Sequence, residues 1–350
     1  MNRIMIAIII LASSILLLLA NGHLFSNDTY IRERNVVKGV SFVAPRDSFS
    51  TNPFLDIKKI EANYISVIPY AFMRQEDPNV YYSSAQKRWW GETPEGVLTS
   101  IKMAHDHDVK VMLKPSVWMH RTWTGDIAFE RAADLEIWKK TYRDYILGFA
   151  KMADSLNVDI FCIGNEFKQL VFKYPDYWYD LIGQVRVIYD GKLTYAANWD
   201  AYQKIAFWDA LDFIGINAYF PLSEKSNVSK KDLISSWKPI ERTINQTATN
   251  FDKPVLFTEY GYLSVDGTTF NTWELEKKMR DLPINEAAQS QAFDALYSVF
   301  WEKDYWAGGF IWKWYPTKRH RLEYHKRDYS PQGKITEKTI QQWFQKDNIK

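Results

Sequence analysis

Two glutamates follow two apolar segments of the chain, in positions where a carboxyl group could do acid–base chemistry. Residues 158–163 are mostly apolar and lead into Asn165-Glu166, and residues 254–258 lead into Glu259. An apolar run of this length that ends at polar residues is typical of a buried strand. Cleavage of a glycosidic bond uses two carboxyl groups, one to protonate the leaving oxygen and one to attack the anomeric carbon or activate water. Glu166 and Glu259 are therefore the candidate catalytic pair.

From residue 36 onward, apolar strand-like segments alternate with amphipathic helical segments. The predicted strands are 36–43, 64–70, 109–115, 158–163, 192–197, 211–219, 254–260 and 308–314. The predicted helices are 55–62, 93–105, 129–156, 175–188, 230–251, 285–302 and 336–345. Alternation of this kind predicts a parallel α/β fold. Because the strands number eight and no change of composition divides the chain, we predict a single (β/α)8 TIM barrel over residues 31–350.

Polar and aromatic residues collect at the C-terminal ends of the predicted strands, where barrels of this kind carry their sites. Besides the two glutamates they are Asn198, Trp199, Asp200, Asn217, Tyr219, Tyr260, Trp312 and Trp314. Aromatic residues make up 16% of the chain, and several stand in predicted loops such as 118–123. A large aromatic core is one interpretation of this composition. A cleft lined with flat faces for a sugar ligand is the other, and the loop positions favour it for some of these residues.

Taken together, these residues resemble a clan of retaining β-glycosidases that are built on (β/α)8 barrels. The motifs that carry the resemblance are Gly164-Asn165-Glu166 on the fourth strand and Thr258-Glu259-Tyr260-Gly261 on the seventh. Within that clan the chain from about Lys38 resembles glycoside hydrolase family 113, the β-1,4-mannanases. The supporting segments are 38–42, 111–115, 309–314 and 328–334. The resemblance implies a retaining endo-β-1,4-mannanase that acts on mannan-type polysaccharide, and we expect neither a cofactor nor a metal.

The resemblance also implies roles for individual residues. Glu166 would be the general acid/base and Glu259 the nucleophile. Asn165 would hydrogen-bond the sugar 2-hydroxyl, Tyr219 would orient Glu259, and Trp312 would form the floor of the subsite where cleavage occurs. Further candidates for substrate binding are Lys114, Asn198, Trp118, Trp199 and Trp314, with Trp90 and Trp123 as additional sugar platforms.

One position departs from the pattern of the clan. Many members carry an arginine near the end of the second strand that supports the nucleophile. Here the second predicted strand ends at Tyr70, and the nearest arginine is Arg74, which lies further into the loop. The sequence therefore leaves open which cation supports Glu259.

Three other interpretations stay open at this point. Glu166 and Glu259 could be structural, since carboxylates at strand ends can pair with Lys or Arg. The enzyme could be another β-glycanase or β-glycosidase of the same clan, because fold does not fix function. The chain could also be a non-catalytic carbohydrate-binding barrel, although such a protein would be free to lose either glutamate.

Bulk composition excludes several other classes of site and partner. The chain has 44 basic and 42 acidic residues and a formal net charge of +2, which gives no reason to expect nucleic acid as a partner. No protein partner is indicated either. Cys162 is the single cysteine, so an intramolecular disulfide and a cysteine metal site are excluded. We interpret residues 105–108 as a solvated turn on the face opposite the site. We interpret the basic run at 318–321 as a solvated loop, and its position at the rim of the site leaves a substrate role open.

The first 30 residues are predicted to be a targeting segment rather than part of the fold. Arg3 supplies positive charge, and residues 4–20 form an apolar run of 17 that is interrupted by Ser13-Ser14. A signal peptide has an apolar region of about 7–15 residues, and a membrane span needs about 20. We therefore expect an exported protein, periplasmic or extracellular, with a retained single membrane anchor as the alternative.

The N-terminal residue of the mature protein tests this expectation. Cleavage after Ala20 would leave Asn21 as the first residue when the full-length gene product is isolated from its producing cell and sequenced from its N-terminus. An intact Met1 on membrane-bound protein would contradict cleavage and favour the anchor.

Overall fold

The structure is a computed structural model, and it describes residues 36–82, 89–317 and 322–346. The predicted targeting segment and the basic run at 318–321 lie outside the described residues. Within the described ranges, no helix combines the length and the apolar character needed to cross a membrane.

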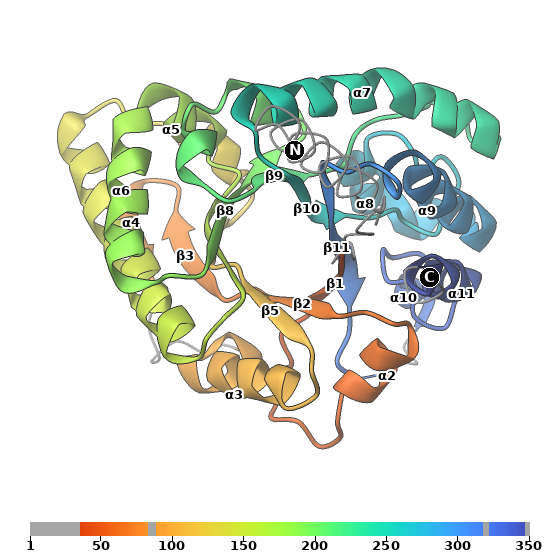
Figure 1. The fold of residues 1–350 in the computed structure, drawn as a ribbon, viewed down its shortest axis with the longest axis horizontal. Helices are drawn as coiled ribbons and strands as arrows, with labels where there is room; N and C mark the ends of the chain where they lie inside the picture. Colours follow the sequence, from red (N-terminus) through yellow and green to blue (C-terminus); the bar gives the residue numbers. More distant parts are fainter. Residues whose placement is uncertain (1–35, 83–88, 318–321, 347–350) are drawn as a thin grey trace, which may run out of the picture. The chain divides into compact units, whose positions relative to one another are not determined.

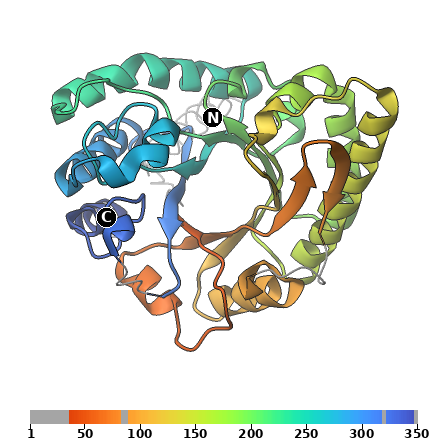
Figure 2. The same cartoon turned by 180° about the vertical axis from the view of Figure 1, so that it is seen from behind.

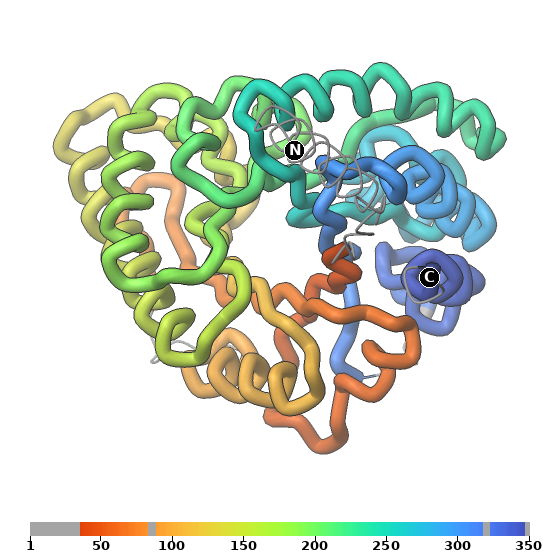
Figure 3. Tube along the Cα trace, in the orientation of Figure 1, coloured from red at the N-terminus to blue at the C-terminus, as the bar shows by residue number. Residues whose placement is uncertain are grey.

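Eight parallel strands close into a barrel, which confirms the predicted (β/α)8 fold. The strands are β1 (Val37–Phe42), β2 (Tyr64–Val67), β5 (Lys110–Leu113), β7 (Ile160–Asn165), β8 (Lys192–Asn198), β9 (Ile214–Asn217), β10 (Val255–Tyr260) and β11 (Trp306–Trp314). Their order around the barrel is β1-β11-β10-β9-β8-β7-β5-β2, so the first and last strands are neighbours. Figure 1 looks along the barrel, and the tube in Figure 3 follows the closed ring of strands with the helices outside it.

The strands are buried on both faces, which explains their continuous apolar runs. Every residue of β1 and of β10 is buried. A small apolar cluster made by alternate strand residues fills the barrel: Val37, Met112, Ile160, Cys162, Ala196, Leu256 and Phe310. Cys162 thus serves as a small buried hydrophobic residue. A second and much larger cluster joins the outer faces of the strands to the helices.

Seven helices lie in the ranges where the apolar spacing predicts helices. They are α2 (Phe54–Lys59), α3 (Pro94–His105), α4 (Ala132–Ser155), α6 (Pro175–Ile188), α7 (Lys230–Phe251), α9 (Glu286–Phe300) and α11 (Ile335–Phe344). The start of α3 shows the expected chemistry, since the Thr93 side chain accepts a hydrogen bond from the Gly96 N–H at 3.1 Å and Pro94 takes the first helical position.

The structure also contains several short helices. The α-helices are α5 (Lys168–Lys173), α8 (Thr272–Lys278) and α10 (Leu322–His325). The 3-10 helices are η1 (Trp90–Glu92), η2 (Thr124–Asp126), η3 (Tyr202–Lys204), η4 (Phe207–Ala210) and η5 (Met279–Asp281). The sequence predicts one short helix, just before the sixth strand, where η3 and η4 lie, and it does not predict the others. Helices this short have too few turns to leave an apolar period in the sequence.

Two predicted strands end earlier than expected, and the chain that follows each of them belongs to a separate sheet. The second strand was predicted to reach Tyr70 and the third to reach Pro115, but β2 ends at Val67 and β5 at Leu113. Pro69 and Pro115 have no N–H to donate to the barrel ladder. The chain then forms β3 (Tyr70–Arg74) and β6 (Ser116–Met119), which stay parallel neighbours, and β4 (Asp77–Tyr81) adds to the edge of β3. Figure 2 shows the orange strands of this second sheet beside the barrel, close to the yellow-green helices.

Candidate active site

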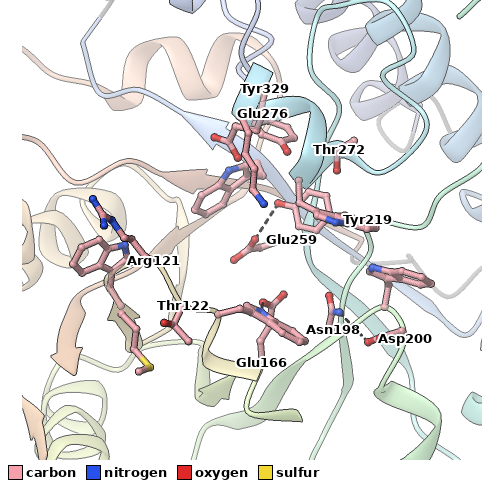
Figure 4. A pocket seen from close by; sticks show the side chains of 17 residues that line it. Arg121, Thr122, Glu166, Asn198, Asp200, Tyr219, Glu259, Thr272, Glu276 and Tyr329 are labelled. Carbon is pink, nitrogen blue, oxygen red and sulfur yellow. Dashed lines mark hydrogen bonds between the residues drawn. The ribbon is translucent and has the colours of Figure 1, made fainter. Parts of the chain in front are cut away.

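An open cavity of about 880 Å³ lies at the C-terminal ends of the barrel strands and contains both candidate glutamates. Its lining residues are Trp118, Met119, Arg121, Thr122, Trp123, Glu166, Asn198, Trp199, Asp200, Tyr219, Glu259, Thr272, Trp273, Glu276, Lys277, Trp312 and Tyr329. Figure 4 shows the Glu166 and Glu259 carboxyl groups facing each other across this space. The barrel thus brings together two residues that are 93 positions apart in the sequence.

Glu166 is held by both its backbone and its side chain. It follows the end of β7 with a φ of 60°, a left-handed conformation that is uncommon for a residue with a side chain. Its N–H donates to the Ala196 carbonyl at 2.9 Å, which fixes this turn to β8. Asn217 Nδ2 donates to Oε1 at 2.7 Å, and Trp123 Nε1 donates to Oε2 at 2.6 Å. Both carboxyl oxygens are therefore fixed in place.

The surroundings of Glu166 favour its protonated form relative to an ordinary glutamate. Burial raises the pKa of the Glu166 carboxyl, and the negative charge of Glu259 raises it further. The hydrogen bonds from Asn217 and Trp123 and the positive charge of Lys114 act in the opposite direction, but the pKa remains raised. Such a carboxyl group is suited to donate a proton near neutral pH.

Glu259 has a different environment, because its partners include a cation. It is 8% exposed at the end of β10. Lys114 Nζ contacts Oε1 in a buried ion pair, and the Tyr219 hydroxyl donates to Oε2 at 3.0 Å. Burial, followed by the Glu259 charge, raises the pKa of Tyr219 well above its usual value, so the phenol keeps the proton that it donates. These two donors orient the carboxylate toward the cavity.

Lys114 supplies the cation that the sequence left unassigned. It directly follows β5, is fully buried, and reaches Glu259 from the opposite side of the barrel, since β5 and β10 stand opposite each other in the strand order. Arg74 instead ends β3 as an exposed residue opposite Asp77. The sequence predicts Lys114 to be a substrate contact. The structure places it behind Glu259, outside the cavity lining.

Asn217 joins Glu166 to Asn165 on β7 and to Thr258 on β10 through side-chain hydrogen bonds. It ends β9 and is 1% exposed. Its Nδ2 donates to Glu166 and, at 3.0 Å, to Asn165 Oδ1, while its Oδ1 accepts from Thr258 Oγ1 at 2.9 Å. The sequence placed Asn217 at a strand end without a role. The sequence feature that could have indicated a role is its position as a single amide residue between the apolar residues Ile216 and Ala218. Asn165 is held in this network beside Glu166.

The segment 328–334, one of those that carried the family resemblance, forms a buried latch behind the site. Lys334 Nζ donates to the Asp328 carbonyl at 2.9 Å and to Ser264 Oγ at 2.7 Å, and the Tyr315 hydroxyl donates to Asp328 Oδ2 at 2.9 Å. Ser264 lies after β10 and Tyr315 after β11. The latch therefore ties together the loops that follow these two strands.

The latch also supports the cavity wall. Tyr329, which belongs to it, lines the cavity, and its ring packs edge-on against Tyr219 with centroids 6.2 Å apart. Tyr219 in turn holds Glu259. The segment thus acts on the site through two aromatic rings.

The predicted aromatic platforms have different positions in the structure. Trp312 lines the cavity, and Gly261 allows its carbonyl to approach closely, because an added Cβ at Gly261 would lie 2.5 Å from the Trp312 oxygen. Trp118 and Trp123 line the cavity on one side. Trp199 lines it on another and stacks on Trp273, with centroids 5.8 Å apart and planes 23° from parallel. Asn198 also lines the cavity and donates to Asp200 Oδ1 at 2.9 Å.

Two predicted aromatic contacts lie away from the cavity lining. Trp314 is 1% exposed and belongs to the main apolar core. Its placement in the site relied on regular alternation along the strand, but Val40 pairs with Ile311 and Phe42 with Trp314, so β11 has one extra residue here. The Trp312–Lys313 peptide in this segment is cis. Trp90 packs edge-on against Phe49 with centroids 5.3 Å apart.

Helix α8 contributes four cavity residues that the sequence does not predict: Thr272, Trp273, Glu276 and Lys277. Burial raises the pKa of the Glu276 carboxyl, and Lys313 opposes this effect. The segment was missed because it lies between the seventh predicted strand and the next predicted helix, where only a loop was expected. Among the described residues, no group of three or more His, Cys, Asp or Glu side chains is placed to hold a metal ion.

Comparison with known proteins gives one family. A family model described as Glycoside Hydrolase Family 113 matches residues 44–334. No curated protein matches the chain. A solved structure described as a complex of a GH113 β-1,4-mannanase aligns with a TM-score of 0.75 and 23% identity, covering 89% of this chain and 99% of that one.

Two further solved structures are similar to the chain. The GH113 β-mannanase of Alicyclobacillus acidocaldarius, in complex with ManMIm, has a TM-score of 0.75 and 24% identity over 89% of this chain and 98% of that one. A β-glucuronidase of Faecalibacterium prausnitzii has a TM-score of 0.54 and 15% identity over 88% of this chain and 48% of that one. At these identities the likeness shows the fold.

Substitution of Trp123 by Phe tests the electrostatics of Glu166. The change removes the N–H that donates to Oε2 and stabilises the charged carboxylate, so the pKa of Glu166 should rise further. Carbon-13 NMR titration of selectively labelled glutamate carboxyls measures this shift. Trp118→Phe, which changes another tryptophan of the cavity lining, is the matched control. A Glu166 pKa that stays constant or falls in the Trp123 variant would contradict the assigned hydrogen bond.

Proposed function

The chain belongs to glycoside hydrolase family 113, and we propose that it is an endo-acting β-1,4-mannanase that retains the configuration of the anomeric carbon. The observation that carries this proposal is the pair of unequal carboxyl groups in the cavity. Glu166 has a raised pKa, whereas Glu259 is paired with a buried cation. A retaining glycosidase needs one carboxyl group that carries a proton and one that attacks.

The first chemical step uses both groups at once. Glu259 attacks the anomeric carbon and forms a covalent bond to the sugar, while the bond from that carbon to the leaving oxygen breaks. Glu166 gives its proton to this oxygen. Lys114 and the Tyr219 hydroxyl hold the attacking carboxylate in position, and Trp123 and Asn217 hold the acid.

The second step follows from the electrostatics of the first. Once Glu259 is bonded to the sugar, its negative charge is gone, and that charge is one of the causes that raise the pKa of Glu166. The pKa of Glu166 therefore falls, and the carboxylate can take a proton from water as the water attacks the anomeric carbon. Water replaces Glu259 on the sugar, and both glutamates return to their starting states.

Three kinds of observation support mannan as the substrate. The two GH113 neighbours are described as β-mannanases, one of them with the specific linkage β-1,4. The cavity is open at the strand ends and carries aromatic side chains on more than one side, as a chain-like sugar ligand would need. Trp312 lines the cavity, and Asn165 lies beside the acid. A cavity that is open at the strand ends leaves room for a chain to extend beyond the cleaved bond, which favours cleavage within a chain.

Polysaccharide assays test the substrate. Protein from residue 31 onward is incubated with mannan, glucomannan, cellulose and xylan, beside the Glu259→Ala variant, and reducing ends are counted. We expect release from mannan and glucomannan that falls at least about 10³-fold in the variant. Release from cellulose alone would keep the chemistry and overturn the substrate. Binding to a polymer without release from any would favour the non-catalytic carbohydrate-binding barrel.

The configuration of the first product tests the mechanism separately. Proton NMR of the reaction mixture, recorded before the sugar equilibrates in water, should show the β-anomer. An initial α-anomer would mean direct attack by water, and Glu259 would then be a general base rather than a nucleophile.

Substitution of Lys114 by Met tests how the nucleophile is supported. The change removes the buried cation beside Glu259 but keeps a side chain of similar length, so kcat/KM on mannan should fall roughly 10- to 100-fold. Lys110→Met on the same strand is the matched control, because Lys110 is exposed and packs over Tyr64 away from the site. Thermal unfolding of both variants separates lost activity from lost fold. Equal activity in the two variants would contradict the role of Lys114.

A further inference from the structure

Three aromatic side chains form a row across the second sheet. Phe72 on β3 is in register with Tyr81 on β4 and with Trp118 on β6. Side chains of residues that are paired in this way lie on the same face of a sheet. We refer to Tyr81, Phe72 and Trp118 as the aromatic row. Two strand spacings separate its ends, which is about 10 Å.

The aromatic row lies on the exposed face of the second sheet. Alternate residues of β3 and β6 such as Ala71, Met73 and Val117 are buried on the other face. By contrast, Trp118 is 50% exposed and Tyr81 is 38% exposed, while Phe72 between them is partly exposed. The Phe72 and Trp118 rings pack side by side, with centroids 5.6 Å apart and planes tilted by 31°. The three rings are thus open to solvent along one line.

The row is continuous with the catalytic cavity. Trp118 is both its inner member and part of the cavity lining, beside Arg121 and Trp123. From Trp118 the row runs across β3 to β4, the edge strand of the second sheet. A ligand that leaves the cavity past Trp118 therefore meets Phe72 next and Tyr81 after it.

The outer end of the row is fixed before any ligand binds. The Tyr81 hydroxyl donates to Asp77 Oδ2 at 2.7 Å, and Asn79 Nδ2 donates to Asp77 Oδ1 at 2.8 Å. These two hydrogen bonds, first the one from Asn79 and then the one from Tyr81, lower the pKa of the Asp77 carboxyl. The tyrosine ring therefore loses little freedom on binding, and a preorganised contact costs less affinity than a flexible one.

We propose that the aromatic row binds the part of the polysaccharide chain that extends beyond the catalytic cavity. This inference rests on the proposed function, since it takes the occupant to be a β-1,4-linked mannan chain. Sugar rings present C–H faces that pack on aromatic rings, and their hydroxyl groups remain in water at an open surface. The row offers a succession of such rings on the path of the chain.

The size of the row favours a sugar chain over a protein partner. An aromatic side chain buries about 150–250 Å² at most, so three rings bury no more than about 450–750 Å². Stable protein interfaces bury about 1,200–2,000 Å² in total. A strip that is one ring wide and leads into a glycoside hydrolase cavity suits a single extended chain.

Binding of oligosaccharides of increasing length tests the proposal. The full chain carrying Glu259→Gln, which blocks turnover, is titrated by calorimetry with β-1,4-manno-oligosaccharides of three to six units. Phe72→Ala and Tyr81→Ala are each added to this protein. We expect each to weaken binding of the longest ligand about 3- to 10-fold, and to flatten the gain in affinity with length.

Tyr179→Ala is the matched control for Tyr81→Ala. Tyr179 is also an exposed tyrosine whose hydroxyl donates to an aspartate, Asp209, but it lies on α6 away from the cavity lining. Circular dichroism of every variant checks that the sheet is folded. Affinity for the longest ligand that is equal in the Phe72, Tyr81 and Tyr179 variants would overturn the aromatic row as a binding site.

The active enzyme separates this outcome from failure of the proposed function. Cleavage of mannan together with unchanged long-chain affinity in the variants would overturn the row alone. Absence of mannan cleavage by the unsubstituted enzyme, together with no binding of manno-oligosaccharides, would overturn the proposed function and the proposed occupant of the row with it.

Discussion

The buried ion pair between Lys114 and Glu259 is the interaction on which the rest of the site depends. An uncompensated charge inside a protein costs several kcal/mol, so a fully buried lysine requires its carboxylate partner. The two residues come from strands that stand opposite each other. An eight-stranded barrel is just narrow enough for side chains from opposite walls to meet. Closure of the barrel thus creates the contact, and the contact fixes the carboxylate that faces the acid Glu166.

Much of the fold could be predicted because eight buried strands leave eight apolar runs in the sequence. The same count placed Glu166 and Glu259 at the mouth of the barrel, where the structure brings them together. The predicted ends of β2 and β5 were wrong because apolar character continues past Pro69 and Pro115, although these prolines end the barrel ladder. An apolar pattern indicates that a segment is buried. Because β3 and β6 are also buried on one face, the pattern does not separate them from the barrel strands β2 and β5.

Details of the site that depend on three-dimensional pairing were not readable from the pattern. Nothing in the sequence around Lys114 distinguishes a lysine that contacts the substrate from a lysine that pairs with Glu259. Trp314 was placed in the site by regular alternation, and an irregular ladder between β1 and β11 puts it in the core. The contributions of α8 depend on a short helix in a predicted loop, and its stacked Trp273 becomes visible only beside Trp199.

The latch at residues 328–334 makes the site depend on a part of the chain that follows both catalytic residues. β11 closes the barrel beside β1, and Tyr329 packs against the ring of Tyr219. Glu166 and Glu259 both precede these residues in the sequence. Translation must therefore pass residue 334 before the cavity around the two glutamates can be complete.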